Sequence, residues 1–246
     1  MKAVAINVGA NTNAPGFRGP IFPDGGFEFV PIPETEPTRE PVPTYGDLPI
    51  SIPVPDRVRD TRVHLDPSFA EYGPASGYTY GDPYGVKARP LLDLAAGDRV
   101  YFYATLTPSE PREGTGDIAP WIAPDWGAYL IGRFVLASDP IPGERYEALP
   151  AARKRPFEAN AHVRRETFDA AVLLAGDPAE SGLLGRAVPL SAPSAGVEPN
   201  RVVTAWSADS GRGPWWRRPL RFDDAATRRL DRLRTADDGR LLALAD

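Results

Sequence analysis

The chain of 246 residues contains no cysteine and two histidines. Without cysteine it has no disulfide, no thiolate metal site, no iron–sulfur cluster and no cysteine nucleophile. The histidines, His64 and His162, are about a hundred residues apart and have no H-x-x-x-H or similar ligand spacing, so a zinc centre would have to borrow carboxylates. We therefore expect neither a metal nor a cofactor.

Other familiar signals are missing as well. The sequence has no stretch of 18 apolar residues and no charged-then-apolar leader, so we expect a cytoplasmic protein that does not contact a membrane. It also lacks the G-x-x-x-x-G-K-[ST] and G-x-G-x-x-G motifs that cradle phosphates, and the G-x-S-x-G elbow of serine hydrolases. Nucleoside triphosphate sites, dinucleotide cofactor sites and serine hydrolase chemistry are thus not expected in their usual form.

Proline, glycine and arginine are abundant. The 29 prolines and 23 glycines predict many short elements joined by long irregular connections. Arginine supplies 25 of the 28 basic residues, and its planar fork suits bidentate contacts with phosphate. Residues 201–246 hold ten basic and seven acidic side chains, so this tail is the basic end of a chain whose net charge is −5.

A glycine-rich loop at residues 8–34 follows a short apolar strand at residues 3–8. Its five glycines indicate either the turns of a long hairpin or backbone positions that a ligand approaches closely, and both interpretations stay open. Within the loop, Asp24-Gly25-Gly26 predicts a turn, and residues 26–32 predict an edge strand that ends at prolines. The polar side chains of the loop that suit ligand binding are Asn11, Asn13, Arg18, Asp24 and Glu28.

Patterns of apolar residues predict an α+β fold. Two runs rich in aromatic and β-branched residues, 99–106 and 129–136, predict an antiparallel pair of core strands, and residues 170–175 predict a buried strand. Helices are expected at 144–155, interrupted by Pro150, at 178–187 after a capping Asp177, and from Asp223 to about Thr235. We expect a mixed or antiparallel, barrel-like core with flanking helices and long loops rich in proline and glycine.

Three segments together resemble the third type of the nucleotide modification associated domains. They are INVGANTN…GFRGPIFPDGGFEFVPIPE, LAAGDRVYFYATL…WGAYLIGRF and NAHVRR…AVLLAGDPAESGLLGRAVPLS, in that order along the chain. The resemblance covers nearly the whole chain and implies a setting, hypermodified bases in DNA, rather than an established reaction. The central strand pair is also similar to PUA-like domains such as the EVE and ASCH domains, which implies a PUA-like core.

Within that setting we predict a protein that binds nucleic acid or a nucleotide and recognises a modified base in a pocket lined by the glycine-rich loop. Asparagine and arginine offer the bidentate edges that read a purine, and a carboxylate accepts from an exocyclic amine. The base-binding candidates are Asn11, Asn13, Arg18, Asp24 and His162. The phosphate-binding candidates are Arg164, Arg165, Arg217 and Arg218.

Two other interpretations remain. The first is an enzyme that modifies or processes a nucleobase with Asp24, Glu28 and His162 as acid and base. The second is a structural or scaffolding protein, in which the tryptophans and arginines of the tail belong to a docking helix rather than to a base-stacking surface.

The resemblance also divides the chain and implies partners. Residues 1–200 would form the nucleotide modification associated domain, and residues 201–246 a basic extension, rich in tryptophan and arginine, with a helix packed on the same domain. The expected partners are DNA or a modified nucleotide, together with other DNA-modification proteins.

Overall fold

The computed structural model describes residues 1–110, 117–208 and 213–245. These residues fall into two compact units, each built from segments that are distant in the sequence. Unit 1 takes Met1–Val30, Tyr101–Gly132 and Leu184–Asp246, and unit 2 takes Pro31–Val100 and Arg133–Leu183. The predicted domain boundary at residue 200 does not coincide with this division and stays a prediction.

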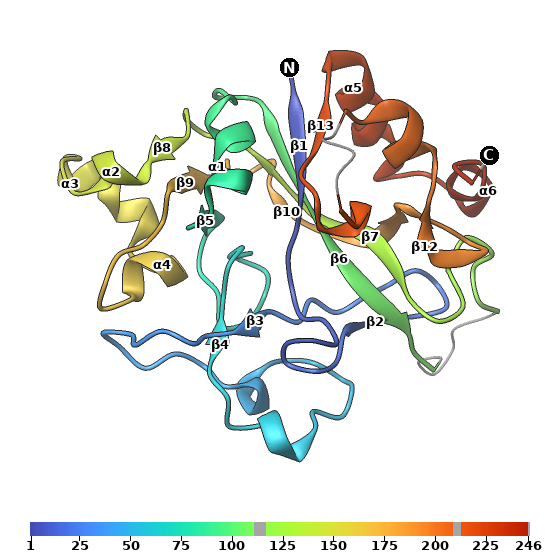
Figure 1. Cartoon of the computed structure of the whole chain (residues 1–246), viewed down its shortest axis with the longest axis horizontal. Coiled ribbons are helices and arrows are strands. Elements are labelled where there is room, and N and C mark those ends of the chain that lie inside the picture. Colours follow the sequence, from blue (N-terminus) through green and yellow to red (C-terminus); the bar gives the residue numbers. More distant parts are fainter. Residues whose placement is uncertain (111–116, 209–212, 246) are drawn as a thin grey trace. The chain divides into compact units, whose positions relative to one another are not determined.

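Unit 1 is organised around an open β-sheet with the strand order β10-β7-β6-β1-β13, and β2 pairs in parallel with β6. Figure 1 shows β13 alongside β1; the two strands are antiparallel, with Ala3 opposite Phe222 and Ala5 opposite Leu220. One end of β6, β7 and β10 lies in the residue ranges of unit 2. The strands are β1 Ala3–Asn7, β2 Gly19–Ile21, β6 Arg99–Pro108, β7 Gly127–Val135, β10 Gly182–Pro189 and β13 Leu220–Phe222.

The middle strands of this sheet are buried on both faces. Every residue of β7 is buried, and so are the first four residues of β1. Strands covered on both faces have nearly continuous apolar sequences instead of an apolar–polar alternation. This explains why runs such as AVAI and AYLI predict core strands so clearly.

Helix α5, Asp224–Leu233, is the main helix of unit 1. Asp223 caps its N-terminus by accepting a hydrogen bond of 2.8 Å from the backbone N–H of Ala226. Leu230 and Leu233 are buried, and Asp231 accepts a 2.6 Å hydrogen bond from the hydroxyl of Tyr101 on β6. The other elements of unit 1 are β11 Ser191–Ala192, β12 Ala195–Pro199, a π-helical turn Val202–Trp206, a 3₁₀ helix Trp215–Arg217 and α6 Asp238–Leu242.

Unit 2 contains an antiparallel sheet β5-β9-β8 and an antiparallel pair β3–β4. Ile141, Tyr146, Phe157 and Leu173 belong to its apolar core, where the ring of Tyr146 stacks on that of Phe168 at 5.0 Å between centroids. Its strands are β3 Ile32–Pro33, β4 Val63–His64, β5 Thr79–Asp82, β8 Ile141–Pro142 and β9 Val172–Ala175. Its helices are α1 Gly85–Leu92, α2 Gly143–Tyr146, α3 Ala151–Lys154 and α4 Ala161–Arg164, with 3₁₀ helices at Tyr45–Asp47, Asp56–Val58 and Arg155–Phe157.

Several predictions from the sequence are confirmed. The fold is α+β, the expected strands are β1, β6, β7 and β9, the last predicted helix is α5, and Pro150 separates α2 from α3. No closed barrel is found among the described residues, so the barrel-like core and the PUA-like similarity stay predictions. Within the same residues, no helix has both the length and the apolar character needed to cross a bilayer.

Two predicted elements were wrong. The expected helix 178–187 stops after one turn, in which the N–H groups of Glu180 and Ser181 donate to the carbonyl of Asp177, and the chain then enters strand β10. The two glycines in β10 disfavour a helix at this position, and pairing with β7 stabilises the strand. The expected edge strand 26–32 is reduced to an isolated bridge at Phe27 and the two-residue β3, although the turn at Asp24 is present.

The close packing at Gly143 generates a test of the fold of unit 2. The N–H of Gly143 donates to the carbonyl of Ala171 at 2.9 Å, and a β-carbon at Gly143 would overlap the carbonyl oxygen of Ala170. We expect Gly143→Ala to lower the free energy of unfolding by about 1–3 kcal/mol, because the backbone must move to admit the methyl group. Urea denaturation followed by circular dichroism measures this loss.

Gly85→Ala is the matched control, because a β-carbon at Gly85, the first residue of α1, meets no atom within 4 Å. We expect this variant to be as stable as the wild type, or more stable by about 0.4–1 kcal/mol. Equal losses of stability in the two variants would contradict the packing described for Gly143.

Candidate functional site

Three buried side chains of unit 2 converge: His64, Asp66 and His162 each place one ligand-type atom within 4.8 Å of the others. The carboxylate oxygen Oδ2 of Asp66 lies 4.0 Å from Nε2 of His64 and 3.5 Å from Nε2 of His162. The two imidazole rings meet edge to face, with centroids 4.7 Å apart and an interplanar angle of 82°. We call these three residues the His–Asp–His cluster.

Backbone pairing positions the first two members of the cluster. β3 and β4 pair so that Ile32 lies opposite His64, and the residue after β3, Glu34, donates its N–H to the carbonyl of Arg62. The chain then turns tightly, because the N–H of Asp66 donates to the carbonyl of His64 at 2.8 Å. This turn brings the side chains of His64 and Asp66 together, and the pairing of β3 with β4 brings Glu34 beside them.

Helix α4 supplies the third member. Asn160 caps the helix, with its side-chain oxygen accepting from the N–H of His162 at 3.1 Å. The amide nitrogen of Asn160 donates to Oδ1 of Asp66 at 3.0 Å and to the hydroxyl of Thr79 at 3.2 Å. A single buried asparagine therefore fixes the start of α4 relative to the carboxylate of Asp66 and to β5.

Gly81 of β5 permits this close approach. Its N–H donates to Oδ2 of Asp66 at 2.8 Å. A β-carbon at Gly81 would lie 2.7 Å from Cδ2 of His162 and 3.3 Å from the side-chain oxygen of Asn160. Any larger residue at this position would displace the imidazole from the cluster.

A second layer of charged groups orients both imidazoles. Nδ1 of His64 lies 2.6 Å from Oε2 of Glu34, and Nδ1 of His162 lies 2.7 Å from Oδ1 of Asp169. Arg165 joins the two carboxylates, with Nη2 donating to Glu34 at 2.8 Å and Nη1 donating to Asp169 at 2.5 Å. Because a carboxylate only accepts hydrogen bonds, each Nδ1 carries the proton of its short contact.

This layer sets two of the pKa values. Burial acts to raise the pKa of Glu34, but hydrogen bonds from His64 and Arg165 outweigh it and lower that pKa to about 2. Burial, together with the nearby His64, lowers the pKa of His162 to about 4 against the opposing effect of Asp169. At neutral pH, Glu34 is therefore charged and His162 is neutral.

The pKa of Asp66 is dominated by burial. Burial raises the pKa of its carboxyl well above the ordinary value, although hydrogen bonds from Gly81 and Asn160 favour the charged form. The nearby Asp82, which accepts a 2.6 Å hydrogen bond from the hydroxyl of Tyr80, adds a further unfavourable charge. The carboxylate of Asp66 thus lies where a positive charge would be favourable.

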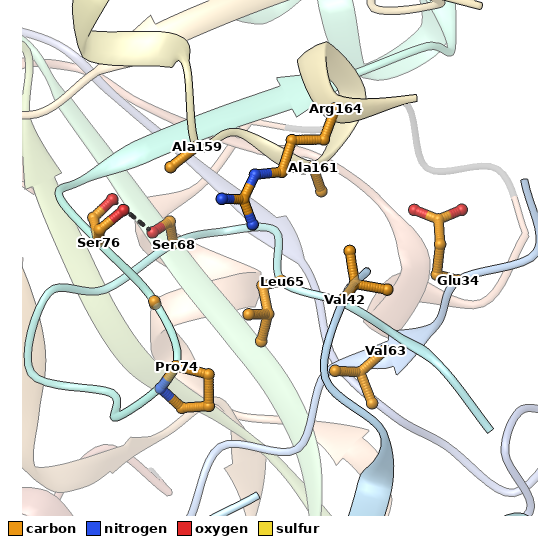
Figure 2. Close-up of a pocket in the computed structure, with 11 residues that line it drawn as sticks. Glu34, Val42, Val63, Leu65, Ser68, Pro74, Ser76, Ala159, Ala161 and Arg164 are labelled. Atoms are coloured by element: carbon orange, nitrogen blue, oxygen red, sulfur yellow. Dashed lines mark hydrogen bonds between the residues drawn. The ribbon is translucent and has the colours of Figure 1, made fainter. Parts of the chain in front are cut away.

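A small hollow, partly open to solvent, lies beside the cluster within unit 2, with Glu34 among the residues that line it. Figure 2 shows the Arg164 side chain extending from α4 toward Ser68, with the carboxylate of Glu34 on another side of the hollow. Nη2 of Arg164 lies 3.7 Å from Oε2 of Glu40, and its Nε is buried without a hydrogen-bond partner among the described residues. The other lining residues are mostly apolar: Val42, Val63, Leu65, Pro74, Ala75, Ser76, Ala159 and Ala161.

The predicted base-binding residues are divided between the units. His162 belongs to the cluster in unit 2, whereas Asn11, Asn13, Arg18 and Asp24 belong to unit 1. Asn11 accepts from the N–H of Asn13 at 2.8 Å, and Asp24 accepts from that of Gly26 at 2.8 Å, so both side chains stabilise their own turns. The guanidinium of Arg18 lies over the ring of Trp126, 4.8 Å from its centroid.

The remaining predicted residues have varied surroundings. Arg164 lines the hollow, while the guanidinium of Arg165 is occupied by Glu34 and Asp169. Arg217 is exposed, and Arg218 is half-buried and donates to the carbonyl of Gly213. Glu28, the further acid–base candidate, is half-buried in unit 1.

Sequence reasoning missed most of the cluster. Two of its three residues, His64 and Asp66, were not predicted, and neither were the surrounding residues Glu34, Asn160 and Asp169. The H-x-D spacing of His64 and Asp66 is a local signal for two of them, since one intervening residue keeps both side chains within reach of a common point. The expectation of no metal depended on the distance between His64 and His162 along the sequence. The folded chain brings the two imidazoles into contact.

Comparison with known proteins identifies the family. A family model described as nucleotide modification associated domain 3 matches residues 2–234, which confirms the resemblance and covers parts of both units. Among curated proteins and among solved structures, no match was found.

The lowered pKa of His162 predicts a pH dependence of stability. Between pH 6.5 and about 4, the unfolded chain binds a proton at this imidazole and the folded chain does not, so the free energy of unfolding falls as the pH is lowered. The contribution is roughly 3 kcal/mol across this window. Urea denaturation in the presence of a chelator, compared between the wild type and His162→Gln, isolates it.

The variant should lose that part of the slope, because glutamine does not titrate. The contributions of Glu34 and Asp66 remain in both proteins. An identical slope between pH 4 and 6.5 in the two proteins would contradict a buried neutral His162.

Proposed function

The chain belongs to the nucleotide modification associated domain 3 family, and we propose that it is an enzyme acting on the base of a nucleotide, either free or within nucleic acid. The reactive groups of this enzyme are those of the His–Asp–His cluster. Of the three reactive residues predicted from the sequence, His162 stays in the site, while His64 and Asp66 take the places of Asp24 and Glu28.

The observation that carries the proposal is the construction of the cluster. Two imidazoles and a carboxylate are withdrawn from water and held by a further layer of partners, Glu34, Asp169 and Arg165. Withdrawing ionisable groups from water is unfavourable, so such sets gather where shifted pKa values serve chemistry. A fold that needed these side chains only for packing would be served as well by apolar residues of similar size.

The hollow beside the cluster suits a nucleotide. The apolar part of its walls suits the face of a base or sugar, and Arg164 provides a cation for a phosphate, in line with its predicted role. Glu34 lies between the hollow and the cluster, because it lines the hollow and also accepts the hydrogen bond from His64. A ligand held by Arg164 would thus lie on the side of the cluster where Glu34 orients an imidazole.

His162 presents an electron pair inside the cluster. Its imidazole is neutral at physiological pH, and its Nε2 is directed toward Asp66, while Nδ1 is engaged by Asp169. Asn160 and Gly81 hold this orientation without reacting themselves, so we regard them as positioning residues.

The phosphate contact of Arg164 is directly testable. We expect Arg164→Ala to weaken binding of deoxynucleoside 5′-monophosphates by about 10- to 100-fold, because it removes a charge-assisted hydrogen bond. Isothermal titration with the four monophosphates, and with the corresponding nucleosides, measures the difference. The nucleosides should bind almost equally to the wild type and the variant.

Arg153→Ala is the matched control, because Arg153 is an exposed arginine of α3 that does not line the hollow. Conversion is examined separately by mass spectrometry of nucleosides from DNA of cells that express the wild type or His162→Gln. Absence of both monophosphate binding and any altered nucleoside would refute an enzyme of this class.

A second candidate function is a reader of modified bases that uses unit 1. A cation–aromatic group favours it: Arg18 lies over Trp126, whose ring meets that of Trp216 edge to face at 5.5 Å. Bases stack on such aromatic rings with little dependence on sequence. In this function the base contacts come from Asn11, Asn13, Arg18 and Asp24, and the phosphate contacts come from Arg217 and Arg218.

Salt dependence distinguishes this second candidate. If Arg217 and Arg218 contact phosphates, replacing both by alanine should reduce the slope of log affinity against log salt by about 2 for double-stranded DNA, because fewer counterions are released. Fluorescence anisotropy with modified and unmodified DNA at several salt concentrations measures the slope. Arg145→Ala, an exposed arginine of unit 2, should leave it unchanged. A slope that the double variant does not alter removes these arginines from the interface.

A further inference from the structure

We propose that the His–Asp–His cluster binds one divalent first-row transition-metal ion, of the Zn²⁺ or Fe²⁺ type, through Nε2 of His64, Nε2 of His162 and a carboxylate oxygen of Asp66. This inference deepens the proposed function, because it concerns the same cluster and names its cofactor. Metal binding is measured without any nucleotide, so it stands or fails separately from catalysis.

The first step of the argument is the protonation of the two rings. Glu34 and Asp169 occupy Nδ1 of His64 and His162 at 2.6 and 2.7 Å, and carboxylates accept but do not donate. Arg165 approaches the same Nδ1 atoms at 3.3 and 3.4 Å, which are longer contacts than those of the carboxylates. When a ring carries a single proton, that proton therefore resides on Nδ1, and its Nε2 presents a lone pair.

The second step is the direction of these lone pairs. Both Nε2 atoms face Oδ2 of Asp66, at 4.0 Å from His64 and 3.5 Å from His162. Three electron-pair donors thus converge on one buried point, where they repel one another unless a cation or a proton lies between them. Two imidazole nitrogens and one carboxylate oxygen form a common ligand set for a transition metal.

The surrounding layer has the form that metal ligands require. A histidine that binds a metal usually donates its other N–H to a carboxylate or carbonyl, which fixes the ring and strengthens the donor nitrogen. Both histidines of this cluster have such a carboxylate partner, and Arg165 holds the two carboxylates in place. The amide of Asn160 likewise orients Asp66.

The three ligand atoms lie within 4.8 Å of one another, so the site must close on binding. Ligand atoms about 2.0–2.2 Å from a zinc ion lie about 3–3.5 Å from one another. The separations of 3.5 and 4.0 Å within the cluster come close to these values. Three protein ligands also leave a coordination position open, as catalytic metal sites do, and the ion would supply an electrophile there.

The ligand set narrows the class of metal. Mg²⁺ and Ca²⁺ prefer sites made entirely of oxygen, which two imidazoles do not provide. With no cysteine in the sequence, a thiolate site is excluded. Two imidazoles with one carboxylate suit Zn²⁺, and the same set with open positions suits Fe²⁺.

The two histidines make the test direct, because the wild-type protein labelled with [¹⁵N]histidine contributes only four ring nitrogens. Long-range ¹H–¹⁵N correlation spectra are recorded on the full chain after treatment with a chelator, and then during addition of ZnCl₂. We expect both Nε2 resonances to shift, with saturation at one equivalent of zinc, while both Nδ1 nitrogens remain protonated.

Variants identify the ligands by isothermal titration with ZnCl₂. His64→Gln and His162→Gln should each weaken binding at least 100-fold, because each removes one of three ligands. Asp169→Asn should weaken it about 10- to 100-fold through loss of the carboxylate that orients His162. Glu166→Gln, an exposed carboxylate three residues before Asp169, is the matched control and should bind zinc like the wild type.

Several outcomes would overturn the inference. If a saturating excess of Zn²⁺, or of Fe²⁺ without oxygen, leaves both Nε2 resonances in place, a proton and not a metal satisfies the cluster. Zinc binding that is equally strong in the two histidine variants would place the metal elsewhere. The spectra need no variant, so they decide the question even where a substitution prevents folding.

Discussion

The withdrawal of the Asp66 carboxylate from water is the constraint on which the surroundings of the cluster depend. A charge removed from water costs several kcal/mol unless neighbouring groups compensate. The compensation present in the fold is partial: the N–H of Gly81 and the amide of Asn160 donate to Asp66, while the two imidazoles turn acceptor nitrogens toward it. The arrangement is therefore incomplete without a proton or a metal ion, and the tight turn after His64 and the capped start of α4 both hold it.

The same constraint connects the cluster to function. Glu34 orients His64 and also lines the hollow into which Arg164 extends. The same side chain therefore borders both the hollow, proposed for a phosphate, and the cluster, proposed for a cation. Membership of the nucleotide modification associated domain 3 family suggests involvement in nucleic acid modification, and the proposed ligand and reaction rest on the hollow and the cluster. The stacking group of Arg18 and Trp126 in unit 1 is a separate feature, which fits recognition of nucleic acid instead of conversion.

Local signals predicted much of the fold and little of the cluster. Strands β6 and β7 were found because aromatic and β-branched runs favour strands wherever they are buried, and α5 because its cap and apolar stripe lie within a few residues. The helix expected after Asp177 failed because pairing with β7 outweighed a good cap. The cluster brings residue 64 next to residue 162 through the pairing of β3 with β4 and the contacts of Asn160 with Asp66 and Thr79. Such contacts leave no periodic pattern in a single sequence, and the H-x-D spacing alone occurs too readily by chance to identify a site.

Anomalous diffraction from crystals of the zinc-treated protein tests the central claim most directly. Data collected just above the zinc absorption edge should show one anomalous peak between the imidazoles of His64 and His162 and the carboxylate of Asp66, about 2.0–2.2 Å from each ligand atom, and data collected just below the edge should not. The peak should also vanish when the crystals are treated with a chelator before data collection. A well-ordered cluster without a peak at that point, with a water molecule or a short hydrogen bond joining Asp66 to an imidazole, would contradict the account.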